Sequence, residues 1–397
     1  MYPLRLSHFT ATSSIGCGLV QTLDALRARR GGLAPSSFDT VDLPTFVGEV
    51  AGVDDVRLPA QWARFDCRNN RLALMGLQQD GFSQAVAAAA EKYGASRVGV
   101  FIGTSTSGIL QTELAYRRRD PVSGALPPDF IYGTTHNTFS VADFTRHYLG
   151  LTGPAVVVSS ACSSSAKVFG SARRMMQAGL IDAAVVGGVD SLCLTTLYGF
   201  NSLGLTSTQA CRPFDAARDG ISIGEAAAFI LLEPASAQPT PGDVLLWGVG
   251  ESSDAHHMSS PHPEGLGARL AMEQALAMAG LAPAAIDYIN LHGTATPSND
   301  AAEAKAVSGV FGNGTPCSST KGATGHTLGA AGGIEAVICA LALQNGFKPG
   351  GINTTACDPD LPVGYLTDNQ EIAPQFVLSN SFGFGGTNCS LIFGLAG

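Results

Sequence analysis

The feature that most restricts the fold of this chain is an alternation of strand-like and helix-like segments. Short runs of apolar, often β-branched residues, such as RVGVFIG, LIDAAVVGGVDS and AIDYINLHG, are separated by alanine-rich stretches throughout the 397 residues. This alternation is typical of α/β proteins, in which helices cover buried sheets. The hydrophobic fraction of 45% supplies enough apolar side chains for a large core.

The same order of pieces occurs twice, which predicts a duplicated fold. The pattern xGTxT follows a strand at 102–106 and again at 292–296. Each copy is followed by a small-residue turn, SACSS at 160–164 and CSSTK at 317–321, and then by another strand. Such a repeat indicates two similar halves. The proline-dense connector at 234–243 predicts a boundary between a first half at 1–235 and a second half at 236–397.

One cysteine lies where the chain changes from strand to helix. In VVVSSACSSSAKVFG, Cys162 follows an apolar run and precedes a predicted helix. Backbone N–H groups and the positive end of the helix dipole favour the thiolate at such a place, which would make Cys162 a nucleophile. The alternative is that Cys162 is a small buried residue between two elements.

The second half supplies groups that can assist a thiolate. His292 follows a strand, Lys321 and His326 lie five residues apart in a glycine-rich stretch, and Phe384 lies within FGFGGTN near the C-terminus. All follow predicted strands, and α/β sheets present their reactive groups at strand ends. The sequence therefore predicts one site built from both halves.

Composition excludes several other classes of protein. The net charge of −9 argues against a nucleic-acid-binding protein, which needs concentrated Lys and Arg. The nine cysteines are widely spaced and form no CxxC pair, so neither disulfides nor a metal site is expected. We find no signal-peptide pattern and expect no membrane-crossing segment, which indicates a cytoplasmic protein.

Four ordered motifs, SACSSS, HGTATPSND, KGATGHTLGAAG and NSFGFGGTN, resemble those of the elongating β-ketoacyl-acyl-carrier-protein synthases of the thiolase superfamily. The resemblance covers nearly the whole chain and implies a five-layered αβαβα fold of two similar halves. It implies an acyltransferase that joins malonyl carrier protein to an acyl group by decarboxylative Claisen condensation. It also implies that no cofactor is bound, because phosphopantetheine arrives on the acyl carrier protein.

The resemblance assigns a role to each residue of the predicted site. Cys162 would accept the acyl group, and His292 and His326 would stabilise the enolate that forms when carbon dioxide leaves. Lys321 would hold the site around His326 and Glu303. The remaining assignments are an oxyanion hole of the Cys162 and Phe384 N–H groups, pantetheine contacts from Thr294 and Thr296, and an acyl pocket that includes Thr106 and Phe382.

The partners expected from the resemblance are an acidic carrier protein and a second, identical or related ketosynthase chain. Candidate docking residues for the carrier protein are Arg64, Arg68, Arg71, Arg117, Arg118 and Arg119, although a solvated face also explains both clusters. The product would enter fatty-acid, polyketide or aryl polyene biosynthesis. A noncatalytic subunit that shapes a partner's pocket is the alternative function, and the presence of Cys162 argues against it. Asp190-Ser191-Leu192 is similar to a carrier attachment site but ends a buried strand.

Overall fold

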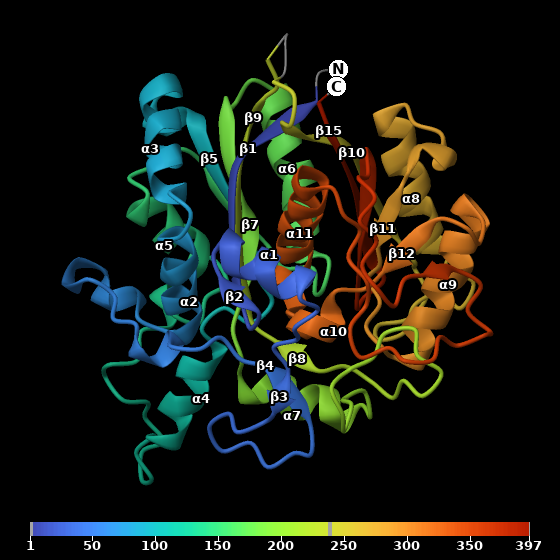
Figure 1. Cartoon of the computed structure of the whole chain (residues 1–397). Coiled ribbons are helices and arrows are strands. Elements are labelled where there is room, and N and C mark those ends of the chain that lie inside the picture. Colours follow the sequence, from blue (N-terminus) through green and yellow to red (C-terminus); the bar gives the residue numbers. More distant parts are fainter. Residues whose placement is uncertain (1–2, 237–239, 397) are drawn as a thin grey trace.

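Five layers of secondary structure make up the protein (Figure 1). The structure is a computed structural model that describes residues 3–236 and 240–396. Helices cover the outside of two sheet regions, and further helices fill the space between them, which confirms the predicted αβαβα fold. The outer helices are α2 (Arg68–Leu77), α3 (Phe82–Tyr93) and α5 (Ser140–Tyr148) on one side, and α8 (Leu266–Ala279) and α9 (Pro297–Phe311) on the other. The central helices are α1 (Leu19–Arg27), α6 (Ser164–Gln177) and α11 (Ala331–Asn345).

The strand order confirms the duplication. The first half pairs its strands in the order β6-β5-β7-β9-β1, and the second half in the order β12-β11-β14-β15-β10. When the five strands of each half are numbered by their order along the chain, their order across the sheet is 3-2-4-5-1 in both halves. The first-half strands are β1 (Leu4–Ser13), β5 (Val98–Gly103), β6 (Ala155–Val158), β7 (Ala183–Asp190) and β9 (Ala226–Pro234). The second-half strands are β10 (Val244–Ser253), β11 (Tyr288–Asn290), β12 (Pro316–Ser318), β14 (Phe376–Gly383) and β15 (Thr387–Leu395).

Strand direction repeats as well. In each half the second, third and fourth strands are parallel, and the fourth, fifth and first strands pair antiparallel. Antiparallel pairing of β1 with β10 joins the halves into one sheet, which short strands β2 (Gly16–Cys17) and β13 (Gly364–Tyr365) extend. The proposed domain boundary lies between β9 and β10, in a connector whose residues 237–239 are outside the described part of the chain.

Helix α11 is the centre of the core. Its residues from Ala331 to Leu343 are all buried, because sheet or helix covers every side of it. The segment Leu328–Asn345 is long and apolar enough to cross a membrane by length and composition, contrary to the sequence expectation that no stretch is. However, 89% of that segment is buried inside the fold. Its apolar character is therefore explained by its place between the two halves.

A small second sheet lies at one end of the molecule, and the sequence did not predict it. It contains β3 (Ala34–Pro35), β4 (Phe46–Gly48) and β8 (Ile223–Gly224). Helices α4 (Ile109–Arg117), α7 (Leu194–Ser202) and α10 (Lys321–Thr324) lie near this end (Figure 1). Ile223 of β8 forms a bridge with His326, so this sheet supports a residue of the predicted site.

Candidate active site

Cys162 lies in the turn between β6 and α6, as the sequence predicts. The preceding residue, Ala161, has a φ of 51°, a left-handed conformation that residues with a Cβ seldom adopt. Helix α6 begins two residues after the cysteine, so its N-terminal end faces the sulfur. Only 5% of Cys162 is exposed. The turn therefore holds a buried sulfur in a fixed place at the end of the sheet.

The two predicted histidines meet this cysteine. Nε2 of His326 lies 3.0 Å from Sγ of Cys162, and the rings of His292 and His326 have centroids 5.4 Å apart. The Cys162 sulfur and one ring nitrogen of each histidine lie within 4.8 Å of one another. That spacing also suits a metal ion, so the absence of a metal stays a prediction from the sequence. Residues from both halves thus converge on one point, although Cys162 and His326 are separated by 164 positions in the sequence.

Lys321 contacts a carboxylate that the sequence analysis did not identify. Its Nζ forms a buried ion pair with Glu335 of α11 and lies 3.4 Å from Nδ1 of His292. The structure therefore pairs Lys321 with Glu335 beside His292, where we had expected Glu303. The Lys321 charge still acts on His326, as expected. Because an ammonium group can only donate, it leaves the lone pair on Nδ1 and the hydrogen on Nε2 of His292. The signal for Glu335 was the acidic residue inside the otherwise apolar GAAGGIEAV.

Glu303 has a different task from the one expected. Its two carboxylate oxygens accept hydrogen bonds from the N–H groups of His292 (2.8 Å) and Gly293 (2.7 Å). The amide of Asn380 donates a third, at 3.2 Å. Burial raises the pKa of Glu303 to about 7, against these donors, which lower it. Glu303 therefore fixes the backbone that carries His292.

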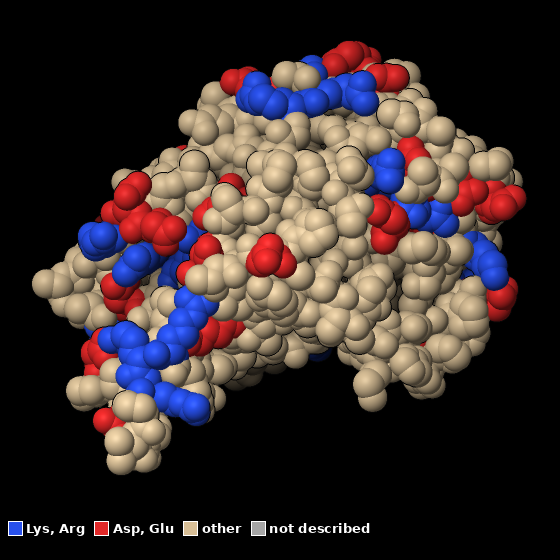
Figure 2. Space-filling model, turned by 90° about the horizontal axis from the view of Figure 1, so that it is seen from below, with Lys and Arg blue, Asp and Glu red and all other residues tan. Residues whose placement is uncertain are grey.

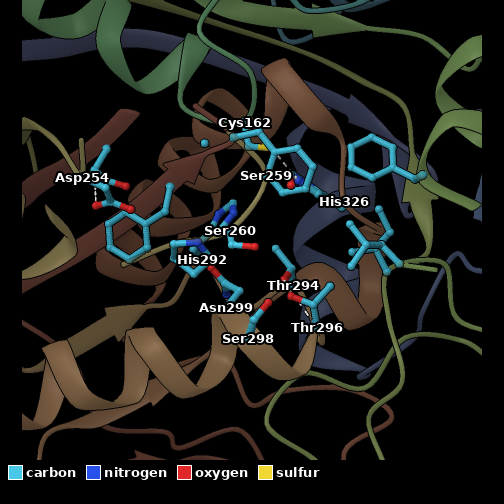
Figure 3. A pocket seen from close by; sticks show the side chains of 18 residues that line it. Cys162, Asp254, Ser259, Ser260, His292, Thr294, Thr296, Ser298, Asn299 and His326 are labelled. Atoms are coloured by element: carbon cyan, nitrogen blue, oxygen red, sulfur yellow. Dashed lines mark hydrogen bonds between the residues drawn. The ribbon is translucent and has the colours of Figure 1, made fainter. Parts of the chain in front are cut away.

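A pocket opens onto Cys162 and both histidines (Figure 3). Thr294 and Thr296 line it, and their hydroxyl oxygens lie 2.9 Å apart. Phe384 also lines it, and the Phe384 and Cys162 N–H groups face the Cys162 sulfur. The pocket further includes polar residues to which the sequence analysis gave no role. Ser298, Asn299 and Asn388 lie within the quoted motifs, and Asp254, Ser259 and Ser260 lie outside them.

The two predicted acyl-pocket residues have different surroundings. Phe382 lines the pocket, and its ring centroid lies 5.8 Å from that of His292. Thr106 does not line this pocket: it is 1% exposed, and its hydroxyl donates to a carboxylate oxygen of Asp190 at 2.8 Å. The structure therefore places Thr106 in a hydrogen-bonded loop behind the site.

Burial dominates the protonation of the site. It raises the pKa of Cys162 to about 11, although the Lys321 charge and the Phe384 N–H act to lower it. The expectation of a low thiol pKa at the helix start is therefore not met in this structure, because desolvation outweighs the helix end. Burial and the Lys321 charge hold the pKa of each histidine well below its usual 6.5. At neutral pH the site therefore contains a thiol and two neutral imidazoles.

The pH dependence of alkylation checks this conclusion. Since a thiol far below its pKa gains thiolate tenfold per pH unit, we expect alkylation of Cys162 by iodoacetamide to accelerate roughly tenfold per unit between pH 7 and 9. Peptide mapping separates Cys162 from the exposed Cys357, which serves as the internal comparison. A rate that levels off below pH 8 would instead support the depressed pKa that the sequence predicts.

The candidate docking arginines divide into exposed and buried groups. Arg64, Arg117, Arg118 and Arg119 are exposed, and ion pairs join Arg117 to Asp39 and Arg118 to Asp129. Arg71 pairs with Asp66 and is partly buried. Arg68 is a correction: its side chain is 4% exposed and binds Glu225, Glu49 and Asp54, so it is withdrawn from the docking set. On the face seen in Figure 2, charged side chains lie mainly toward the rim, and uncharged atoms cover much of the middle.

Comparisons with known proteins identify the family. Residues 29–238 match the family described as beta-ketoacyl synthase, N-terminal domain, and residues 245–355 match beta-ketoacyl synthase, C-terminal domain. The chain belongs to the β-ketoacyl synthase family. A Staphylococcus aureus 3-oxoacyl-[acyl-carrier-protein] synthase 2 is 34% identical over 317 residues, which cover 75% of each protein. The predicted condensing enzyme of the thiolase superfamily is therefore confirmed, and the chain is a β-ketoacyl synthase.

Further relatives agree with this assignment. A mitochondrial 3-oxoacyl-[acyl-carrier-protein] synthase of Arabidopsis thaliana is 42% identical over 262 residues, which cover 62% of this chain and 57% of that protein. One chain of the complex between a ketosynthase and its chain length factor from Xenorhabdus doucetiae has a TM-score of 0.88 at 38% identity over 100% of this chain and 98% of the other. The ishigamide ketosynthase/chain length factor has a TM-score of 0.89 at 27% identity, with complete coverage of both chains.

Proposed function

We propose that this β-ketoacyl synthase lengthens an acyl chain held on Cys162 by two carbons taken from malonyl carrier protein. The observation that carries the proposal is the meeting of the Cys162 sulfur, two neutral imidazoles and the buried Lys321 at the end of one pocket. Each group has a use in a two-step covalent reaction. A noncatalytic subunit, the alternative, would have no use for the Cys162 sulfur, the two imidazoles or Lys321.

In the first step the Cys162 sulfur attacks the acyl thioester on a carrier protein. The bond from sulfur to the acyl carbon forms, the carrier thiol leaves, and the proton from Cys162 ends on that thiol. His326 is placed to accept this proton in transit, because its Nε2 lies 3.0 Å from the sulfur and its lowered pKa leaves the ring neutral, with one nitrogen lone pair available. We assign the Cys162 and Phe384 N–H groups to the oxyanion of the tetrahedral intermediate.

In the second step malonyl carrier protein enters and loses carbon dioxide. The electron pair of the broken carbon–carbon bond forms an enolate, which attacks the acyl carbon on Cys162, and the cysteine sulfur leaves. We assign the Nε2–H of His292 to the malonyl thioester oxygen, where negative charge develops, together with His326 in the tautomer that carries its hydrogen on Nε2. For His292 this tautomer follows from the Lys321 contact at Nδ1. His326 accepts the thiol proton in its other tautomer, with the hydrogen on Nδ1, and Nδ1, which has no hydrogen-bond partner in the described part of the chain, fixes neither form. The products are a β-ketoacyl carrier protein and carbon dioxide.

We assign the pantetheine arm to the outer part of the same pocket. Thr294 and Thr296 lie there with Ser298 and Asn299, at the start of α9 (Figure 3). These hydroxyl and amide groups can bond the amides of a pantetheine chain, while Phe382 and Leu205 cover its carbon atoms. The cofactor then arrives and leaves with the carrier protein.

The second subunit is proposed to be another ketosynthase-like chain. The Xenorhabdus doucetiae structure is a complex of a ketosynthase with its chain length factor, and one of its chains is similar to this chain. Because this chain carries the cysteine, both histidines and the lysine, we propose that it is the active member of a homodimer or heterodimer. We also propose the cytoplasm as its location; the Arabidopsis relative is named as mitochondrial.

Acylation by carrier proteins tests the function directly. The intact chain is exposed to acyl carrier proteins that bear acyl groups of several lengths and degrees of unsaturation, and its mass is measured before and after. We expect one acyl adduct, mapped by peptide analysis to Cys162, and its abundance ranks the chains accepted. An adduct elsewhere, or none in the presence of candidate partner subunits, would contradict the proposal.

The same assay tests the docking surface. Among the described residues no ion pair holds Arg64 or Arg119, so both are free to meet acidic side chains of a carrier protein. Changing both to glutamine should slow acylation by acyl carrier protein and leave acylation by a small acyl thioester unchanged. Arg97→Gln is the control for loss of a positive charge elsewhere, because Arg97 precedes β5 at the opposite end of the sheet, where it pairs with Asp182.

A further inference from the structure

Asp190 is a fully buried carboxylate that the reaction described above does not use. It is the last residue of β7 and is 0% exposed. Hydroxyl groups of Thr104 (2.6 Å), Ser105 (2.6 Å) and Thr106 (2.8 Å) donate hydrogen bonds to it, as do the backbone N–H groups of Ser105 and Thr106. Asp190 therefore holds the loop that follows β5 in one conformation.

The same carboxylate also reaches the second half of the chain. The N–H of Gly329 donates to Oδ2 of Asp190 at 2.6 Å and lies 3.2 Å from the hydroxyl of Ser105. A Cβ on Gly329 would come within 2.7 Å of both Oδ2 of Asp190 and the Ser105 nitrogen. The backbone at Gly329 thus approaches the carboxylate as closely as a glycine allows.

Gly329 lies three residues after His326, and the segment between them needs external support. Nδ1 of His326 has no hydrogen-bond partner among the described residues, so no side chain fixes the ring from behind. The His326 backbone is held at one end by Ser222 and Gly224 of the small-sheet region. At the other end Leu328 has a left-handed φ of 51°, and the contact that follows is Gly329 with Asp190.

We propose that Asp190 is a positioning residue for condensation: by joining the loop at 104–106 to the Gly329 N–H, it holds the His326 imidazole at the reacting centre. The inference rests on the proposed function, because it assigns His326 the enolate. In this role Asp190, at the end of β7, supports the active site without contacting a reacting atom.

A purely structural role would have a different signature. A buried carboxylate that accepts this many hydrogen bonds stabilises any loop, and its loss would then lower both half-reactions in proportion to stability. A positioning role affects mainly the step that depends on His326 geometry. The two half-reactions therefore have to be measured separately.

The test uses Asp190→Asn in the full chain with its partner subunit. Asparagine keeps the size but turns one acceptor into a donor, which faces the N–H and hydroxyl donors of the loop. We expect a folded protein that loses malonyl carrier protein decarboxylation by roughly tenfold or more, since small displacements at a reacting centre have such effects. Acylation of Cys162 should change much less.

Alkylation of Cys162 gives a second, independent signal. After the dominant effect of burial, the Asp190 charge is among the causes that raise the pKa of Cys162. Removing this anion should move the pH profile of alkylation toward lower pH. A change in protein stability alone would not move the profile in that direction.

Asp215→Asn is the matched control. Asp215 is 2% exposed and accepts from the backbone N–H groups of Ala217, Thr355 and Ala356, none of which lies in the segment from His326 to Gly329. We expect it to lower the melting temperature without separating the two half-reactions. If Asp190→Asn does not fold, Ser105→Ala removes two bonds of the same network and should give the same separation in weaker form.

Three results would overturn the inference: unchanged decarboxylation in Asp190→Asn, equal loss of both half-reactions, or the same separation in Asp215→Asn. Failure of the proposed function is recognised differently. In that case the unchanged protein itself neither accepts an acyl group on Cys162 nor decarboxylates malonyl carrier protein.

Discussion

Cys162→Ala is expected to abolish acyl transfer to the protein and to leave its fold intact. In the proposed reaction the sulfur is the atom that forms the thioester, and Cys162 is the only cysteine among the described residues that line the pocket. The substitution removes one heavy atom from a site that is 5% exposed, which costs about 1 kcal/mol of stability or less. Acyl adducts are counted by intact mass, and folding by the melting temperature and the dimer mass.

The matched control is Cys211→Ala. Cys211 is 1% exposed, burial raises its pKa to about 11 as for Cys162, and its thiol donates to the Lys321 carbonyl. This variant should accept acyl groups as the unchanged protein does. Acylation that persists in Cys162→Ala, or a Cys162→Ala chain that does not fold, would show that Cys162 is chiefly a packing residue.

The fold was predictable because its signals are local and occur twice. The motif xGTxT follows the second strand of each half, at β5 and β11, and the small-residue turns follow the third strands, β6 and β12. Since the parallel strands β5, β6, β11 and β12 carry these motifs at their carboxyl ends, placing Cys162, His292 and His326 together required only that the two halves face each other. The central position of α11 could not be predicted from the sequence. A helix that is apolar on every side has no polar face to show which side is exposed and which side packs against a sheet.

The ion pairs of the site could not be predicted, because their partners are distant in sequence. Arg68 lies at helical spacing between Arg64 and Arg71, which suggested one exposed face, but Glu225, 157 positions away, draws it into the core. Lys321 is likewise paired with Glu335, which is separated from it by a turn and a 3-10 segment. Burial of one charge requires a nearby opposite charge, and only the tertiary fold reveals which residue supplies it.

The protonation state of Cys162 was also beyond sequence reasoning. The helix start after Cys162 was visible in SACSSSAKVFG, and its effect on a thiol is to favour the thiolate. Desolvation acts in the opposite direction and depends on how completely Phe384, His326 and the pocket walls enclose the sulfur. The outcome, a pKa raised to about 11, makes a proton acceptor beside the sulfur necessary for acylation near neutral pH. We propose that His326 is that acceptor.

His326→Ala is accordingly expected to separate the two half-reactions. Decarboxylation of malonyl carrier protein should fall by roughly 10²–10³-fold, the usual effect of removing one donor to a developing oxyanion. Cys162 should still be acylated, more slowly at pH 7, because the neighbouring base is gone. At higher pH more of the Cys162 thiol ionises without help from a neighbouring side chain. Acylation should therefore recover as the pH increases toward 9, whereas decarboxylation should not.

His292→Ala provides the comparison that isolates the role of His326. Both histidines are assigned to the enolate, so both variants should lose decarboxylation. The 3.0 Å contact with the Cys162 sulfur belongs to His326 alone, so only His326→Ala should acquire the steep pH dependence of acylation. Stopped-flow acylation and carbon dioxide release, measured on both variants from pH 6.5 to 9, check the difference. His326→Ala could instead lose acylation and keep decarboxylation. That result would contradict the assignment, because it would mean that His326 assists only the thiol and does not donate to the malonyl thioester oxygen.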